Sequence, residues 1–287
     1  MVTEKENTRE ALKSNFERWL GSFKDVGQRR CGLASIRGQT GTHYAAVVSN
    51  VVADLVEPLP TRARTGQWLN LQAQLLRDAS ATNVILVGTR DEPVTVPASI
   101  VENQVRARFP IPGPGPWLIQ VLATMDTGPR PVIEAEVFAD VEPPKEFEFL
   151  PAPGESSKPA GEDLAKSLFV MLNAARLEEG RRALTRDSLL DRLASQHAMA
   201  MLAAGHIGHD VGDGSPKARF ENAGIFTDVA GENVAYAANV IRIHRTLWAS
   251  PSHRTNILYR SFTKVGLAVI RSRDNTVWAC ELFAALD

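Results

Sequence analysis

The 287-residue sequence contains only two cysteines, Cys31 and Cys280, which lie near opposite ends of the chain. A disulfide-rich scaffold is therefore excluded, and so are zinc fingers, which need closely spaced cysteine pairs. Sequence spacing does not decide whether these two residues form one long-range bridge. Our expectation is that both are buried free thiols.

An excess of charge of one sign is also missing. The sequence has 32 Lys and Arg residues against 33 Asp and Glu residues, which gives a net charge of −1. Such a balance indicates no overall attraction for nucleic acid or for a membrane surface. No stretch is long and apolar enough to span a bilayer, and the first residues lack the apolar core of a signal peptide. We expect a protein that is not transmembrane and binds no nucleic acid.

Short runs of Val, Ile and Leu, separated by Gly and Pro turns, characterise the first half of the chain. They predict a β-sandwich of the immunoglobulin-like type at residues 29–142, preceded by an N-terminal helix within residues 1–28. Residues 143–162 are rich in Pro, Gly, Ser and charge, and they predict an extended linker. We therefore expect two domains, because the pattern changes completely beyond this linker.

Helical periodicity followed by two β-like runs characterises residues 163–287, which predicts an α+β domain. Asp187 is the expected N-cap of its second helix. The closing runs, KVGLAVIRS and TVWACELFA, are separated by Asp274-Asn275, a hairpin signal. The chain shows no evident internal repeat.

Three short segments of this domain combine a His or Glu with a Gly or Pro: GHIGHD at 205–210, GENVA at 231–235 and SPSHR at 250–254. Standard catalytic signatures, such as HExxH, GxSxG and phosphate or dinucleotide loops, are missing. Together with WASPSHRTNIL, FTKVGLAV and WACELFA, the three segments resemble, in their order and spacing, the bacterial branch of the CAP superfamily. This superfamily includes cysteine-rich secretory proteins, venom allergens and pathogenesis-related proteins. The resemblance covers residues 163–287.

The resemblance implies a three-layer α-β-α sandwich with a cleft that carries two histidines and two glutamates. His209, Glu232 and His253 match three of these positions. No residue matches the second glutamate, because residues 233–273 contain no Asp or Glu. We therefore expect a triad in one cleft, with His253 just past a helix end at Pro251.

The candidate roles of these residues follow from their chemistry. His209 and His253 are the predicted metal ligands, and two neutral imidazoles with waters suit zinc, although weakly. Glu232 is either a general base or a side chain that holds a turn at 231–235. Three supporting residues are also expected: Asn233 as a turn residue, and Ser250 and Arg254 as residues that hold the loop.

The resemblance implies an extracellular or periplasmic, non-catalytic binding module. The alternatives are a metal-assisted hydrolase or protease that uses the same cleft, and a lipid-binding protein. The acid-free stretch 233–273 holds six arginines and one lysine. If they share a face, an anionic envelope polymer or a lipid headgroup is the expected partner.

Overall fold

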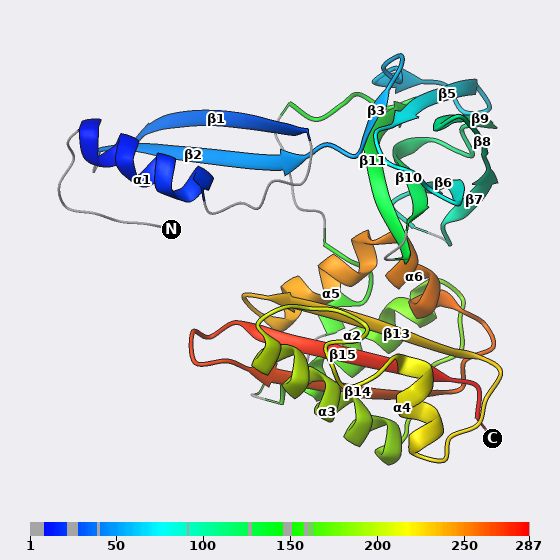
Figure 1. Cartoon of the computed structure of the whole chain (residues 1–287). Coiled ribbons are helices and arrows are strands. Elements are labelled where there is room, and N and C mark those ends of the chain that lie inside the picture. Colours follow the sequence, from blue (N-terminus) through cyan, green and yellow to red (C-terminus); the bar gives the residue numbers. More distant parts are fainter. Residues whose placement is uncertain are drawn as a thin grey trace.

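The computed structural model describes residues 9–21, 28–38, 41–90, 92–125, 128–145, 151–157, 161 and 163–286. Figure 1 shows three parts in chain order: a helix with a β-hairpin, a β-sandwich, and a C-terminal domain of helices around a sheet. The expectations for residues 1–8 and 22–27 of the N-terminal helix, and for parts of the linker, lie outside the described residues.

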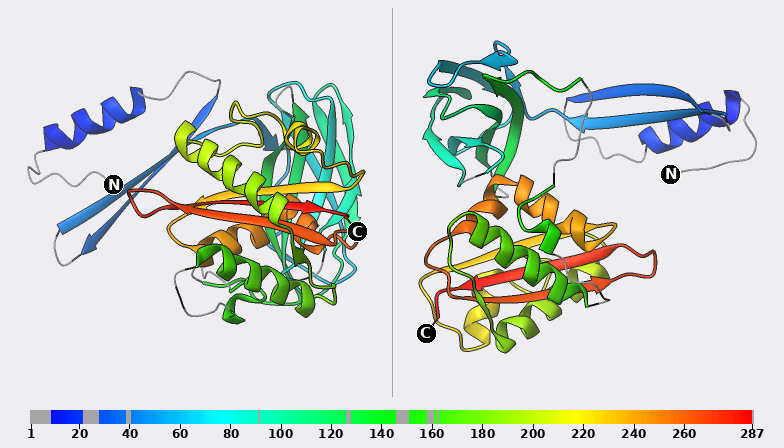
Figure 2. Two further views of the ribbon diagram at one scale, coloured as in Figure 1. Left: turned by 90° about the horizontal axis from the view of Figure 1, so that it is seen from below. Right: turned by 180° about the vertical axis from the view of Figure 1, so that it is seen from behind.

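The first part is a helix, α1 (Arg9–Gly21), and a two-stranded antiparallel hairpin, β1 (Arg29–Gly38) with β2 (Gly41–Asn50). The hairpin projects away from both domains in Figures 1 and 2. The sandwich predicted at residues 29–142 is therefore too long at its start, because β1 and β2 form this separate ribbon. Both cysteines are free, as expected, but Cys31 is exposed because the ribbon has no core around it. Only Cys280 is buried.

The second part consists of two packed sheets. The first has the order β4-β11-β10-β6-β7 and the second has the order β3-β5-β9-β8. Their bounds are β3 (Ala53–Leu55), β4 (Arg62–Ala63), β5 (Trp68–Leu75), β6 (Ala81–Val87), β7 (Val94–Pro97), β8 (Ser99–Val101), β9 (Gln104–Pro110), β10 (Gly115–Met125) and β11 (Gly128–Ala139). Side chains alternate between buried and exposed along β5 and β9, which is the pattern of strands with one face on a core. This part of the chain is β-rich, as predicted.

The C-terminal domain has a four-stranded sheet with the order β12-β14-β15-β13. Its elements are η1 (Glu155–Ser157), α2 (Leu164–Glu178), β12 (Thr185–Arg186), α3 (Ser188–Ala204), α4 (Pro216–Asn222), β13 (Ala230–Ala237), α5 (Val240–Ala249), α6 (Pro251–Leu258), β14 (Lys264–Arg271) and β15 (Val277–Ala284). Helices α3 and α4 cover one face of the sheet, and α2, α5 and α6 cover the other (Figure 2). Asp187 caps α3 by accepting from the backbone N–H groups of Leu189 and Leu190, which confirms the predicted start of that helix.

Two local expectations for this domain are wrong. The GENVA segment forms no turn: it lies inside β13, where Glu232 pairs with Leu282 of β15. The predicted loop after Pro251 is the start of α6, because proline fits the first turn of a helix, where no backbone donor is needed. His253 therefore lies in the first turn of α6.

Part of the predicted linker packs on the C-terminal domain. His244 of α5 donates to the Pro153 carbonyl at 2.8 Å, and the Gly154 amide donates to Glu178 of α2 at 2.9 Å. Gly154 has φ +76°, and a Cβ there would lie 2.3 Å from the Met171 carbonyl oxygen. Only glycine fits this close approach.

A loop of the sandwich also contacts the C-terminal domain. The buried Arg254 of α6 donates to the Gly88 carbonyl at 2.7 Å, and Trp248 of α5 donates to the Thr89 carbonyl at 3.3 Å. Around these bonds lie two ion pairs, Arg90–Glu179 and Arg181–Glu92, each at 2.8 Å.

Candidate functional site

The site begins with an ion-paired carboxylate on an edge strand. Glu232 lies on β13, at the edge of the sheet, and its side chain is 2% exposed. His209 lies in the loop that follows α3, and its Nδ1 donates to Glu232 Oε1 at 2.8 Å. The structure therefore brings two of the three predicted residues into direct contact.

Arg219 of α4 completes the environment of Glu232. Its Nη2 donates to Glu232 Oε2, and its Nη1 donates to the His209 carbonyl at 3.0 Å and to the Gly214 carbonyl. One guanidinium thus fixes both the carboxylate and the loop that carries His209. Its Nε is buried without a partner among the described residues. Sequence reasoning missed Arg219, which carries no motif of its own.

A second buried ion pair supports the same loop. His197 of α3 lies under the loop, with Nδ1 at 2.7 Å from Asp213 Oδ2 and Nε2 at 2.9 Å from the Gly208 carbonyl. Burial raises the pKa of Asp213, but the hydrogen bond and charge of His197 and the charge of Arg219 outweigh it, so the pKa is lowered overall. His197 is a satisfied core histidine that positions the His209 loop.

On the opposite face of β13, Asn233 points toward α6, because successive strand residues face opposite sides. Asn233 Nδ2 donates to the His253 carbonyl at 3.2 Å and to Glu281 Oε2 at 2.9 Å. Its Oδ1 accepts from Asn256 at 2.9 Å. Asn233 is a fully buried strand residue, so its predicted role as a turn residue is wrong.

Glu281 of β15 is a carboxylate that sequence reasoning missed. It is fully buried, and burial raises its pKa to about 7, against the opposing effect of the Asn233 hydrogen bond. Its Oε1 has no hydrogen-bond partner among the described residues. The sequence signal was available: Glu281 is the one charged residue in the otherwise apolar run TVWACELFA.

His253 is the third predicted residue. Burial, followed by the nearby charge of His209, lowers its pKa to about 4. Its Nδ1 is buried and has no partner in the part of the chain that the structure describes. A neutral imidazole with an unpartnered nitrogen therefore lies within electrostatic reach of His209.

Comparison with known proteins bears on this arrangement. Residues 169–282 match the profile of the cysteine-rich secretory protein family, CAP. These residues form a CAP domain. A search of curated proteins returns no significant match.

Solved structures that are similar to the chain include three bacterial proteins. One is an outer surface protein from Borrelia burgdorferi, with 20% identity, a TM-score of 0.42, and coverage of 44% of this chain and 95% of that chain. Another is an extracellular protein containing an SCP domain from Bacillus anthracis, with 16% identity, a TM-score of 0.40, and coverage of 82% and 67%. A third is a cysteine-rich secretory protein from Staphylococcus aureus, with 13% identity, a TM-score of 0.37, and coverage of 76% and 77%.

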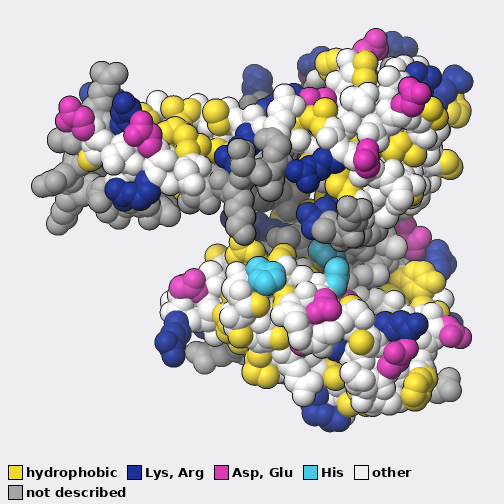
Figure 3. Space-filling model, viewed as in Figure 1, with side chains coloured by type: hydrophobic (Ala, Val, Ile, Leu, Met, Phe, Trp, Pro, Cys, Tyr) yellow, Lys and Arg dark blue, Asp and Glu magenta, His cyan; other side chains and the backbone are white. Residues whose placement is uncertain are grey.

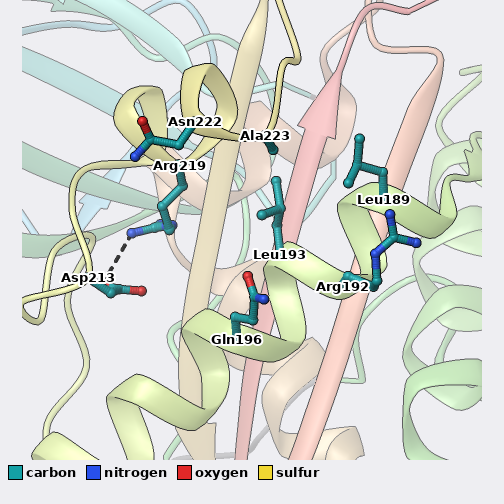
Figure 4. Close-up of a pocket in the computed structure, with 8 residues that line it drawn as sticks. All are labelled: Leu189, Arg192, Leu193, Gln196, Asp213, Arg219, Asn222 and Ala223. Atoms are coloured by element: carbon teal, nitrogen blue, oxygen red, sulfur yellow. Dashed lines mark hydrogen bonds and ion pairs between the residues drawn. The ribbon is translucent and has the colours of Figure 1, made fainter.

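The CAP domain has a groove beside the Glu232 ion pair. It has a volume of about 430 Å³ and lies between α3 and α4. Figure 4 shows Arg219 reaching from α4 toward Asp213, while Leu193 and Gln196 stand on α3. The groove wall is therefore partly apolar and partly polar, and it includes the residue that holds Glu232.

The donor set of the CAP domain limits the metals that it can hold. Among the described residues, no group of three His, Cys, Asp or Glu side chains converges on one point. His209 has Nδ1 fixed by Glu232, which leaves Nε2 as its available nitrogen. His253 offers the unpartnered Nδ1.

The remaining predicted residues have structural contacts. Arg254 donates to the Trp248 carbonyl at 2.6 Å and stacks on the Trp248 ring at 4.6 Å. Ser250 accepts from the Arg254 amide at 2.8 Å through its carbonyl, and its hydroxyl lies 3.3 Å from that of Ser252. Within the acid-free stretch, Arg254 is buried and Arg245 is paired with Glu155. These two arginines therefore do not contribute to an exposed basic face. No helix in the described part of the chain is long and apolar enough to cross a membrane.

Proposed function

We propose that this protein is a non-catalytic binding module of the extracellular or periplasmic space, with the residues His209, Glu232 and His253 as its binding site. The observation that carries the proposal is the state of the Glu232 carboxylate. One oxygen accepts from His209 and the other from Arg219, and the side chain is almost fully buried. A general base needs an oxygen that can reach a water or substrate proton, and this carboxylate has both oxygens in use.

Within this proposal, the two histidines form a weak site for a divalent cation such as zinc. Glu232 orients His209 as a carboxylate orients a metal-bound histidine in known zinc sites. With two protein ligands in place of the usual three, the affinity is low. Zinc bound there would polarise a ligand oxygen, and His209 and His253 would hold the ion.

Titration calorimetry with zinc chloride on the full chain tests the metal site. We expect one site of micromolar affinity or weaker, and loss of binding in His209→Ala and in His253→Ala. The matched control is His206→Ala, because His206 lies in the same loop, is exposed, and has a hydrogen bond to the carbonyl of Ala204 but none to the site residues among those that the structure describes. Binding that survives both cleft substitutions, or that falls equally in His206→Ala, contradicts the assignment.

A peptide-library digest and a vesicle-binding assay test the two alternatives. We expect no turnover, with or without zinc, and no binding to lipid. Turnover that disappears in Glu232→Gln would replace the binding module with a metal-assisted hydrolase. Vesicle binding that depends on the groove would favour the lipid-binding alternative.

A further inference from the structure

The N-terminal hairpin repeats part of the CAP domain. Residues 31–37 read CGLASIR and residues 265–271 read VGLAVIR, so five of seven positions are identical. Both segments form the first strand of an antiparallel hairpin, β1 with β2 and β14 with β15, and both hairpins follow a helix.

The two hairpins also present equivalent faces. In the CAP domain, Gly266, Ala268 and Ile270 face α3, with Leu282 and Cys280 as cross-strand neighbours. In the N-terminal hairpin, the same register gives the docking face, which we define by five residues: Gly32, Ala34, Ile36, Ala45 and Val47. Its three residues on β1 have the same residue types, Gly, Ala and Ile in that order, as the three β14 residues that face α3.

The face of the β14–β15 hairpin that packs on α3 is buried, whereas the docking face is exposed. Ala268, Cys280 and Leu282 are at most 5% exposed because α3 lies on them. Ile36 is 71% exposed and Val47 is 67% exposed. Figure 3 shows apolar side chains at the surface of the hairpin. An isolated two-stranded hairpin has marginal stability in water, so bare apolar residues on it indicate a missing layer.

The glycine identifies the missing layer as a helix. A Cβ on Gly266 would lie 2.1 Å from the backbone of Leu190, because α3 approaches β14 most closely there. A Cβ on Gly32 would meet nothing within 4 Å. Glycine inside a strand weakens it and marks a place where another backbone approaches. Gly32 thus preserves space for a helix that no described residue fills.

We propose that the docking face binds an amphipathic α-helix of the same chemistry as α3, supplied by another polypeptide. The helix presents leucine and small residues four apart, as α3 does with Leu190, Ala194 and Ala198. The five residues of the docking face are uncharged, which matches an apolar helix stripe, while Arg30 and His43 lie on the same side of the ribbon at its two ends. Gly32 receives the helix backbone, and Ile36 and Val47 flank it.

The chain supplies its own probe. A synthetic, helix-stapled peptide of residues 187–205 is labelled with a fluorophore and titrated with the full chain under reducing conditions. We expect saturable binding, weakened about tenfold or more by Ala34→Asp, because the helix would bury an unpaired charge. Ser35→Asp is the matched control: it adds the same charge on the adjacent exposed position, but on the opposite face. A peptide that carries Leu190→Asp should bind the wild-type chain as weakly as the wild-type peptide binds the Ala34→Asp chain.

Three outcomes overturn the proposal. The first is no saturable binding at peptide concentrations of about 0.5 mM, where a useful apolar interface would be occupied. The second is equal weakening by Ala34→Asp and Ser35→Asp. The third is a dimer, detected by light scattering, that dissociates in Ala34→Asp, since the docking face would then be filled by a second copy of the chain. Circular dichroism of each variant confirms that the chain remains folded.

Discussion

Asn233 joins three structural elements through one amide group. It donates to the first turn of α6 and to Glu281 of β15, and it accepts from Asn256 of α6. The adjacent residue, Glu232, performs a similar task on the other face of β13. The candidate site therefore straddles the edge strand, and two neighbouring side chains position its two halves.

The buried Glu281 should make stability depend on pH. Burial raises its folded-state pKa to about 7, from an ordinary value of 4.5. A raised carboxyl pKa contributes stability that is complete below about pH 4.5 and is lost as the pH rises toward 7. The loss is on the order of 3 kcal/mol.

Urea unfolding of wild type and Glu281→Gln between pH 4.5 and 8, in the presence of a chelator, measures this contribution. We expect the variant to gain stability relative to wild type as the pH rises, because glutamine keeps the oxygen that accepts from Asn233 but does not ionise. Glu221→Gln, at an exposed glutamate, is the control. Parallel pH profiles for wild type and Glu281→Gln would show that Glu281 is not held in its protonated form.

Single residues of the site were only partly predictable from sequence. His209, Glu232 and His253 lie in recognisable segments. His209 bonds to Glu232 and its charge contributes to the lowered pKa of His253, while a cleft shared by all three stays a prediction. Arg219 and Glu281 were missed for a physical reason. Their roles depend on packing between elements, and Glu281 reaches Asn233 only through the register of β13 against β15. A search of the sequence near Glu232 does not find Glu281, because strand pairing brings it to Asn233, on the opposite face of β13 from Glu232.

At the scale of elements, we predict that the two hairpins tolerate a glycine-to-alanine substitution to different degrees. In Gly266→Ala, the new methyl group would collide with the Leu190 backbone of α3, so α3 must shift. Overpacking of this kind costs about 3 kcal/mol or more when backbone atoms are involved. In Gly32→Ala, the methyl group enters open space, and we expect a change within about 0.5 kcal/mol.

Thermal and urea unfolding of both variants check this difference. If Gly32→Ala destabilises the free chain as much as Gly266→Ala does, a described or flanking segment already covers the docking face. That result would contradict both this prediction and the proposal that the docking face binds a helix of another polypeptide.

The elements themselves were predicted with uneven success. Helices α2 and α3 follow from apolar periodicity and from the Asp187 cap, which are local signals. The sequence predicts a turn in the GENVA segment, because Gly231 and Asn233 are common turn residues. Pairing with β15 overrides that local preference, since β propensity depends on the neighbours of a strand. The residues of the β1–β2 hairpin are predicted to belong to the sandwich, because the sequence of one strand does not identify the strand with which it pairs.

At the scale of the whole molecule, Arg254 links the candidate site to the β-sandwich. It follows His253 directly and donates to the carbonyls of Trp248 in its own domain and Gly88 in the other. Removal of the guanidinium leaves buried carbonyl groups unsatisfied. Arg254→Ala should therefore cost about 3 kcal/mol and weaken the coupling between the domains.

Differential scanning calorimetry tests this coupling. We expect Arg254→Ala to lower the melting temperature of the CAP domain and to separate its transition from that of the sandwich. Arg90→Ala is the control, because its ion pair with Glu179 crosses the same interface but Arg90 is 54% exposed, so its loss costs under about 1 kcal/mol. Equal, small effects of both substitutions would show that Arg254 does not couple the domains.

The different surroundings of the two cysteines affect how the purified protein behaves in air. Cys280 is enclosed by the CAP core, and burial raises its pKa far above the ordinary range, so it resists oxidation and alkylation. Cys31 is exposed on the hairpin, on the face opposite the docking face. Aerobic storage can therefore join two molecules through Cys31–Cys31 disulfides, which would imitate a biological dimer on a sizing column. The same asymmetry offers a single natural position for a maleimide dye, so that events at the hairpin can be followed without engineering a new thiol.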